Sequence, residues 1–318
     1  MVEKSKLKFS FKIFVLVVFL MIIFFGPQVK AENKPFENSH FIETEGVKLH
    51  YRLYEPEGEV RGKILLVHGL GGSTYCWRET AEPLRREGYL VVSVDLPAFG
   101  YSDRSSGLEH SSEKRAEWLL GLLDHLEENK IKGDIPWTFI GHSMGAKSVT
   151  KMAQKRVEET AGLVYIGGAI YNDPPQLFGD VAKYQPFELL LKASIDKIIL
   201  SSKIMERALN SAYGRELTEE EIEAYVKPLQ RQGTARAWFD VLKSNSPAPE
   251  DLSQFDIPTL LIWGEKDSWV PPEDGKRLVD EMPEARLEII PGEHHMPMVT
   301  APDQVNEIII EFIGEIYE

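Results

Sequence analysis

Apolar residues along the chain fall into short unbroken runs, and segments with a helical repeat lie between several of them. A continuous apolar run of this length is typical of a parallel strand that is covered on both faces. The runs occupy residues 63–67, 89–94, 138–140, 163–166, 259–263 and 286–290. Leucine or isoleucine recurs every three or four residues at 116–128 and 301–316, with Thr300 expected to cap the second helix. The alternation predicts an α/β fold with a doubly wound, mostly parallel sheet.

Two segments depart from this alternation. Residues 41–54 alternate between apolar and polar positions around Glu45-Gly46, which predicts an antiparallel hairpin at one sheet edge. Between Gly168 and Ile257 no strand pattern is found, and the segment is too long for a loop. We expect several helices there, of which one occupies residues 188–200 and another is opened by a capping box from Thr218 to Glu221.

The first 31 residues form a third kind of sequence. Several lysines precede an apolar run from Ile13 to Phe25, and Val29 and Ala31 stand three and one residues before a possible cleavage point. This is the pattern of a secretory signal peptide, and the run is short beside the roughly 20 residues of a membrane span. We therefore expect a secreted or cell-envelope protein. The alternative is an uncleaved N-terminal anchor, which would be the chain's only membrane contact.

Composition narrows the class of protein further. The chain has 318 residues, of which 43% are hydrophobic, and this suits a globular core. A formal net charge of −14 argues against binding to nucleic acid, which needs clustered Lys and Arg. Cys76 is the single cysteine, so neither an intramolecular disulfide nor a cysteine-based metal site can form, and we expect it to be a packing residue.

Candidate chemistry begins at Gly141-His142-Ser143-Met144-Gly145, which follows a short apolar run and precedes a helical segment. A serine on a tight turn from strand to helix is held in a strained conformation, and side chains two residues to either side would collide with the backbone. The turn lifts the hydroxyl clear of the sheet. It also places the next N–H at a helix start, where it can donate to an oxyanion. The pattern therefore predicts a nucleophilic serine.

Later strands end in the groups that such a serine needs. Asp267 follows the run at 259–263, and His294 and His295 follow the run at 286–290. An early run at 63–67 leads into His68-Gly69-Leu70-Gly71-Gly72. These motifs, with the loop from Asp95 to Asp103, resemble the α/β-hydrolase superfamily over nearly all of the chain beyond the N-terminal segment.

The resemblance implies a role for each candidate residue. Ser143 corresponds to the nucleophile, His295 to the general base and Asp267 to the acid that orients it. The family's closing motif selects His295 by its register, and a shift of one residue would make His294 the base instead. Asp173 is the alternative acid. A serine at this position also argues against the dehalogenase and epoxide-hydrolase branches.

The same resemblance covers the groups around the triad. The backbone N–H groups of Leu70 and Met144 correspond to the oxyanion donors, and His68 to a structural histidine. His142 is expected to point away from the nucleophile. Many members carry a helical cap where the strand pattern is interrupted, which gives core parts at 32–171 and 251–318 and a cap at 172–250. Apolar cap residues are candidates for the pocket wall, among them Phe178, Leu189, Trp238 and Phe239.

Together these observations predict a serine hydrolase of the carboxylesterase or lipase type, acting on a small-molecule ester with an apolar acyl group. No cofactor and no metal is expected. Acyl transfer to an alcohol or peroxide and hydrolysis of a carbon–carbon bond could use the same triad. A ligand receptor on the hydrolase fold is the non-enzymatic alternative.

Overall fold

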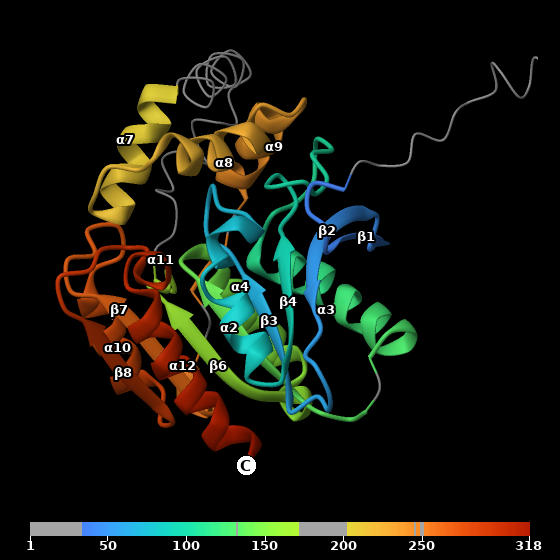
Figure 1. The fold of residues 1–318 in the computed structure, drawn as a ribbon, viewed down its shortest axis with the longest axis vertical. Coiled ribbons are helices and arrows are strands. Elements are labelled where there is room, and N and C mark those ends of the chain that lie inside the picture. The colour runs from blue at the N-terminus through green and yellow to red at the C-terminus, as the bar shows by residue number, and fades with distance from the viewer. Residues whose placement is uncertain (1–33, 132, 172–201, 245, 249–250) are drawn as a thin grey trace, which may run out of the picture. The chain divides into compact units, whose positions relative to one another are not determined.

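Eight strands form one mixed sheet in the order β1-β2-β4-β3-β5-β6-β7-β8 (Figure 1). The computed structural model describes residues 34–131, 133–171, 202–244, 246–248 and 251–318, and those from Phe36 onward form one compact unit. The strands are β1 (Ser39–Thr44), β2 (Val47–Tyr54), β3 (Gly62–Val67), β4 (Tyr89–Asp95), β5 (Trp137–His142), β6 (Thr160–Ile166), β7 (Thr259–Gly264) and β8 (Ala285–Ile290). Strands β4, β3 and β5 to β8 run parallel, so the predicted fold class is confirmed.

The N-terminal edge of the sheet is the predicted hairpin. Strands β1 and β2 pair antiparallel, and β2 also pairs antiparallel with β4. The turn residues Glu45 and Gly46 both have positive φ angles, 48° and 77°. This is the requirement of a two-residue turn whose twist matches the strands.

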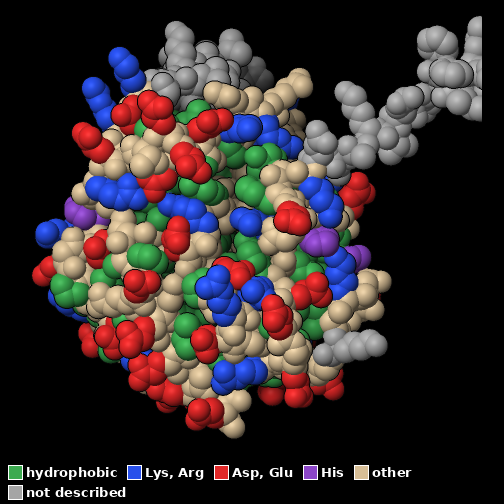
Figure 2. Space-filling model, viewed as in Figure 1, with side chains coloured by type: hydrophobic (Ala, Val, Ile, Leu, Met, Phe, Trp, Pro, Cys, Tyr) green, Lys and Arg blue, Asp and Glu red, His purple; other side chains and the backbone are tan. Residues whose placement is uncertain are grey.

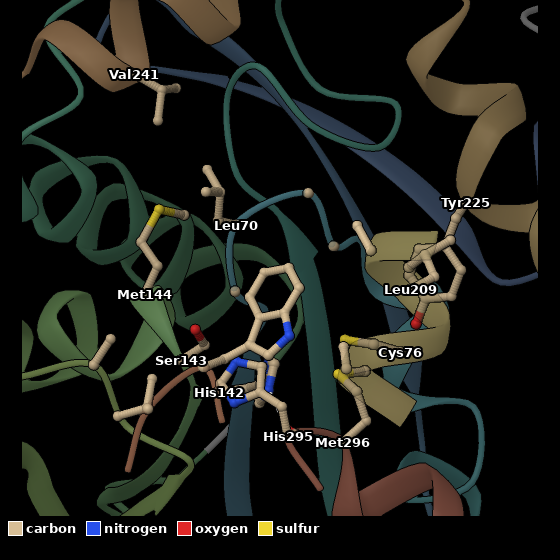
Figure 3. A pocket seen from close by; sticks show the side chains of 18 of the residues that line it. Leu70, Cys76, His142, Ser143, Met144, Leu209, Tyr225, Val241, His295 and Met296 are labelled. Carbon is tan, nitrogen blue, oxygen red and sulfur yellow. Dashed lines mark hydrogen bonds between the residues drawn. The ribbon is translucent and has the colours of Figure 1, made fainter. Parts of the chain in front are cut away.

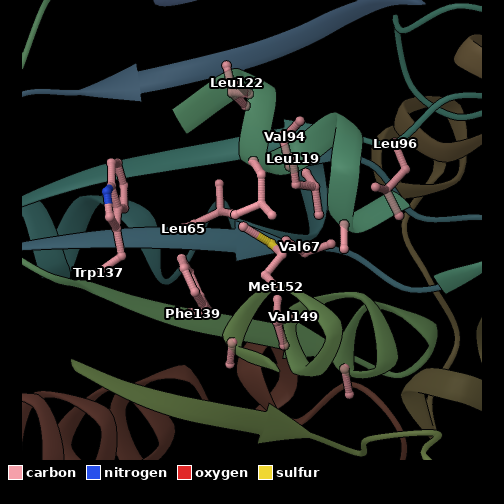
Figure 4. Packing of buried hydrophobic residues seen from close by; sticks show 14 of the residues in the cluster. Leu65, Val67, Val94, Leu96, Leu119, Leu122, Trp137, Phe139, Val149 and Met152 are labelled. Atoms are coloured by element: carbon pink, nitrogen blue, oxygen red, sulfur yellow. The ribbon is translucent and has the colours of Figure 1, made fainter. Parts of the chain in front are cut away.

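Helices cover both faces of the sheet, and the alternation of side chains along the strands decides which face each residue meets. Leu65 and Val67 of β3 pack with α3 (Ser112–Asn129) and α4 (Met144–Lys155), as Figure 4 shows. Their neighbours Ile64 and Leu66 belong to the core on the opposite face. That core also holds buried residues of two further helices, α2 (Ala81–Arg86) and α12 (Pro302–Tyr317).

The described part of the strand-free segment is helical. Helices α7 (Ser202–Tyr213), α8 (Glu219–Leu229) and α9 (Thr234–Lys243) lie between β6 and β7 in the sequence and are grouped at the top of the view in Figure 1. The predicted capping box opens α8, with Thr218 accepting from the Glu221 N–H and the Glu221 carboxylate accepting from the Thr218 N–H. The helix expected at 188–200 lies outside the described residues.

The remaining elements connect the sheet, and one expected cap is wrong. The short helix α11 (Pro297–Thr300) includes Thr300, so α12 begins after Ala301 and not after Thr300. The other elements are η1 (Thr74–Trp77), η2 (Val157–Glu159), η3 (Leu252–Gln254) and α10 (Pro272–Glu281). Over the described residues, no helix is long and apolar enough to cross a membrane. Acidic and basic side chains are interspersed on the face seen in Figure 2.

Candidate active site

Ser143 stands on the turn between β5 and α4, in the strained conformation that the sequence predicts. Its φ and ψ angles are 50° and −119°, in a region that residues other than glycine rarely occupy. The flanking glycines are required by close packing. A Cβ atom on Gly141 would lie 2.7 Å from the backbone nitrogen of Ala146, and one on Gly145 would meet the Val67 carbonyl oxygen. The turn is therefore built against β3, the next strand of the sheet.

Asp267 and His295 are joined by a buried hydrogen bond. His295 Nδ1 donates to Asp267 Oδ2 at 2.7 Å, and each residue is 4% exposed. The other carboxylate oxygen accepts the backbone N–H groups of Trp269 and Val270, at 2.8 and 3.0 Å. With Nδ1 holding the proton, the opposite nitrogen Nε2 of the neutral ring is left to accept one. Asp267 and His295 follow the neighbouring strands β7 and β8, and this brings the two side chains together.

Neighbouring rings and backbone fix the position of His295. The Trp269 ring stacks on it, with centroids 5.7 Å apart and planes 11° from parallel. Gly167, after β6, approaches so closely that a Cβ atom there would lie 3.1 Å from both His295 Nδ1 and Asp267 Oδ2. Ser143 is tied to the same loop, because its N–H donates to the Ile166 carbonyl at 3.0 Å. The three sequence-predicted residues are thus anchored to adjacent strand ends.

The alternative assignments lie elsewhere. His294 packs against Gly214 at the end of α7, where a Cβ atom would overlap its ring. The structure therefore pairs Asp267 with His295 and not with His294. Asp173, the alternative acid, lies outside the described residues.

One expectation about the neighbouring histidine is wrong. His142 does not point away from Ser143, since both line the same cavity and its ring centroid lies 4.7 Å from that of His295. Its Nε2 donates to the His295 carbonyl oxygen at 3.0 Å. Burial, with His295 close by, holds the pKa of His142 well below its usual value, so the ring is neutral. The hydrogen bond from the His142 ring to the His295 backbone explains why His142 lies here, because it supports the loop that carries His295.

The loop after β3 also approaches the serine. A Cβ atom on Gly69 would lie 2.8 Å from Ser143 Cβ, so only glycine fits there. His68 braces the loop, because its Nδ1 donates to the Gly69 carbonyl at 2.7 Å and its Nε2 accepts the Leu96 N–H at 3.0 Å. Burial lowers the pKa of His68, in keeping with this neutral structural role. Leu70 and Met144, the predicted oxyanion donors, both line the cavity beside Ser143.

A cavity of about 420 Å³ joins these groups. In Figure 3, Ser143, His142 and His295 lie together, with Met144 and Val241 on one side and Cys76, Leu209 and Tyr225 on the other. Much of its wall comes from side chains of α7, α8 and α9. These are Met205, Ala208, Leu209, Ala212, Tyr213, Tyr225, Trp238, Val241 and Leu242. Among the sequence candidates for the wall, Trp238 lines the cavity, whereas Phe239 packs beside Leu229 between helices. Phe178 and Leu189 lie outside the described residues.

A second serine, histidine and aspartate form a buried relay that the sequence analysis did not find. Ser39 Oγ and His50 Nε2 are 2.7 Å apart, and His50 Nδ1 donates to Asp95 Oδ2 at 2.7 Å. All three are fully buried. Burial would raise the pKa of Asp95, but its hydrogen bonds and the nearby histidines outweigh burial and lower it to about 2. The relay joins the N-terminal hairpin to the end of β4, and the position of Asp95 at a buried strand end was its only sequence signal.

The single thiol and the metal-ligating side chains do not form a further reactive site among the described residues. Cys76 is 1% exposed and lines the cavity wall, and burial raises the pKa of its thiol, so it is held as a packing residue in the protonated form. Within the part of the chain that the structure describes, no group of three or more His, Cys, Asp or Glu residues could hold a metal ion.

Strand order, elbow and hydrogen-bonded pair together define an α/β-hydrolase of the serine type. The chain belongs to the family described as serine aminopeptidase, S33, whose sequence model matches residues 58–300. An uncharacterized hydrolase of Bacillus subtilis, YugF, is 30% identical over 85% of this chain and 96% of its own length.

Two further similarities are more distant. A 2-hydroxy-6-oxononadienedioate/2-hydroxy-6-oxononatrienedioate hydrolase of Cupriavidus pinatubonensis is 25% identical over 87% of this chain and 95% of its own. The structure of a thermophilic esterase from Thermogutta terrifontis superposes with a TM-score of 0.69 at 22% identity, over 88% of this chain and 99% of that one. At that identity the superposition concerns the fold. The predicted superfamily is confirmed, and the protein is a hydrolase enzyme of the serine type.

Proposed function

We propose that this serine hydrolase cleaves carboxylic esters through an acyl-enzyme formed on Ser143. The observation that carries the proposal is the buried hydrogen bond between Asp267 and His295, at the edge of a cavity that Ser143 and His295 both line. A serine hydroxyl needs a base to remove its proton during attack. His295 is the residue in that position whose other nitrogen is already held by a carboxylate.

In the first step, Ser143 Oγ attacks the ester carbonyl carbon while His295 Nε2 takes the hydroxyl proton. The negative charge that develops on the carbonyl oxygen is stabilised by the Leu70 and Met144 N–H groups. The carbon–oxygen bond to the alcohol then breaks, and His295 returns the proton to the departing alcohol oxygen. Asp267 keeps the imidazole in the right tautomer and stabilises the imidazolium.

In the second step, a water molecule repeats the sequence on the acyl-enzyme. His295 takes a proton from the water as its oxygen attacks the acyl carbon, and gives it to Ser143 Oγ as the acid leaves. The described helices α7 to α9 contribute most of the apolar wall of the cavity. We propose that residues 172–250 act as a cap that excludes bulk water and shapes the acyl pocket.

Hydrolysis of a carbon–carbon bond is the second candidate function. It is favoured by relatives named as 2-hydroxy-6-oxononadienedioate hydrolases, of which several are about a quarter identical to this chain. The same serine, histidine and aspartate would serve that reaction, so the catalytic residues alone do not separate the two.

A panel of 4-nitrophenyl esters with acyl chains of two to twelve carbons, assayed beside a 2-hydroxy-6-oxo dienoate, tests the proposal. We expect ester turnover that varies with chain length and is abolished by an organophosphonate on Ser143. Turnover of the dienoate with no ester cleavage would favour the second candidate. If neither substrate is turned over and the phosphonate does not label Ser143, the proposal is wrong.

We also propose that the protein is exported and cleaved after Ala31. The support is the sequence pattern of residues 1–31, which lie outside the described residues. N-terminal sequencing of protein from its native host should begin at Glu32. Intact Met1 in membrane pellets would instead identify an uncleaved anchor.

A further inference from the structure

One end of the active-site cavity carries a buried cation. Arg115 lies in the first turn of α3, is 3% exposed, and lines the same cavity as Ser143. Helix α3 packs against α4, the helix that begins next to the nucleophile. A charged side chain this deeply buried is ordinarily paired, because taking it out of water is costly.

Another buried arginine shows what a paired one looks like in this protein. Arg104 is 9% exposed and makes four hydrogen bonds, to the Thr234 hydroxyl and to the carbonyls of Gly100, Ser102 and Pro228. Arg115 Nε is buried with no hydrogen-bond partner, and no described residue forms an ion pair with the Arg115 guanidinium. Arg104 therefore holds the fold together, whereas Arg115 Nε has no acceptor among the residues that the structure describes.

No described acid offsets the charge of Arg115. Burial lowers the pKa of Arg115 to about 10, without an opposing carboxylate, so the residue stays charged at neutral pH. The adjacent His110 does not help, because burial and the charge of Arg115 lower its pKa to about 3 and leave it neutral. Among the described residues, no carboxylate therefore compensates the positive charge of Arg115 on the cavity wall, and burying such a charge is costly.

The neighbouring groups add donors to this end of the cavity. Lys147 lies one turn beyond Ser143 on α4, lines the cavity, and donates to the Ser246 carbonyl at 2.6 Å. Trp238 Nε1 is a buried donor with no partner in the described structure, on a side chain that also lines the cavity. Ser246 also lies at the start of α3, because its hydroxyl accepts the Ser112 N–H at 3.0 Å, and this places Lys147 near the first turn that carries Arg115.

We propose that Arg115 binds a carboxylate of the substrate, so that the preferred substrates are compounds with an apolar body and an acidic end. A guanidinium can bind a carboxylate with two parallel hydrogen bonds, and in a buried site such bonds are strong. The apolar body would lie along Ser143 and the apolar part of the cavity wall that includes Leu209 and Tyr225. This inference deepens the proposed function and rests on it for the reacting bond, but not for the binding of the acid.

Turnover tests the preference with matched substrates. The 4-nitrophenyl monoesters of succinic, glutaric, adipic and pimelic acid are compared with the same compounds whose free acid is a methyl ester. We expect native protein to favour at least one acid over its neutral match in kcat/KM. Arg115→Gln should lower the ratio of acid to neutral by roughly tenfold to a hundredfold, and Arg115→Lys should keep part of it. Lys151→Gln, which breaks the ion pair between Lys151 of α4 and Glu113 of α3, should leave the ratio unchanged.

Binding without turnover separates this inference from the proposed function. In Ser143→Ala protein, monomethyl glutarate or its longer homologues should raise the Tm more than the dimethyl esters do, and the difference should vanish in Ser143→Ala/Arg115→Gln. Arg115→Met should not lower the Tm, because it removes a buried charge that no described residue pairs. Acid-dependent stabilisation without ester cleavage would support the subsite and refute the esterase. Ester cleavage with equal ratios in native and Arg115→Gln, or a large loss of Tm in Arg115→Met, would overturn the subsite.

Discussion

The protein contains two sets of serine, histidine and aspartate that share the same histidine–aspartate distance and differ in their surroundings. His295 donates to Asp267 at 2.7 Å, and His50 donates to Asp95 at 2.7 Å. The serine of the first set lines a cavity, whereas Ser39 is fully buried at the sheet edge. The residue types and the carboxylate–imidazole bond are therefore not sufficient to define a catalytic site.

What separates the two sets is the backbone around the serine and its access to a ligand. Ser39 lies in a regular strand, and its hydroxyl oxygen accepts the Phe36 N–H at 3.1 Å while it bonds to His50. Ser143 stands on a turn with positive φ beside a helix start and an open cavity. We infer that the Ser39 hydroxyl serves to stabilise the hairpin and that the Ser143 hydroxyl is available to a substrate.

Removing each serine in turn should give the largest contrast. Ser143→Ala should lower kcat by about 10⁴ to 10⁶, as triad removals do in other serine hydrolases, and leave the Tm near that of native protein. Ser39→Ala should keep kcat and lose about 1–3 kcal/mol of stability, because a buried partner on His50 is left unsatisfied. Ester assays and thermal unfolding of both variants provide the measurement. Retained activity in Ser143→Ala would remove the basis for the comparison.

The paired histidines after β8 sharpen the assignment of the base. His295→Ala should lose activity as severely as Ser143→Ala, and the double variant should lose no more, because both disable one step. His294→Ala should keep substantial activity, since His294 packs against Gly214 and not against Asp267. Steady-state kinetics on the three variants checks this. An inactive His294→Ala beside an active His295→Ala would move the base by one residue.

Acid should weaken the buried relay. The pKa of Asp95 is about 2 in the folded protein against 3.8 for an ordinary aspartate, so ionised Asp95 favours the folded state by about 2 kcal/mol. This contribution is complete above about pH 4 and is lost as the pH falls through 2. Asp95→Asn should therefore be less stable than native at pH 7, and the gap should narrow toward pH 2. Urea unfolding at several pH values measures it, and a gap independent of pH would contradict the relay's electrostatic role.

The smallest effect is expected at Cys76. Because burial raises the pKa of its thiol, alkylation by iodoacetamide at pH 8 should be slow in folded protein and fast in urea. Cys76→Ala should keep the triad's activity. Rapid labelling of native protein that also stops ester cleavage would show the thiol to be more accessible than its position in the cavity wall indicates.

Sequence predicted most of the sheet because its information is local. A run of apolar residues such as 163–166 identifies a buried strand wherever it pairs, and β6 extends it only at its beginning, to Thr160. The proximity of Ser143, Asp267 and His295 could also be predicted, because carboxyl ends of parallel strands meet at one edge, and the resemblance to the α/β-hydrolase superfamily implies their roles. The cap at Thr300 failed, since a short helix ending there competes for the same residue.

Contacts between segments far apart in the chain could not be predicted in the same way. Arg115 lies in the first turn of α3, whose polar sequence predicts exposure to solvent. It reaches the cavity only because α3 packs on α4. Ser39, His50 and Asp95 come together through antiparallel pairing of β1 with β2 and of β2 with β4. In both cases the residue type alone does not predict the role, because the role depends on contacts with distant segments that the hydrophobic periodicity does not identify.

The backbone angle of Ser143 has a consequence for how such a protein can change over generations. A residue other than glycine at φ 50° costs on the order of 1–3 kcal/mol, so glycine there should fold more readily than serine. Selection for catalysis alone keeps the hydroxyl in place. In a lineage that retained this fold only to bind a ligand, the position would be released first, and the loss of one side chain would increase the thermal margin of the whole domain.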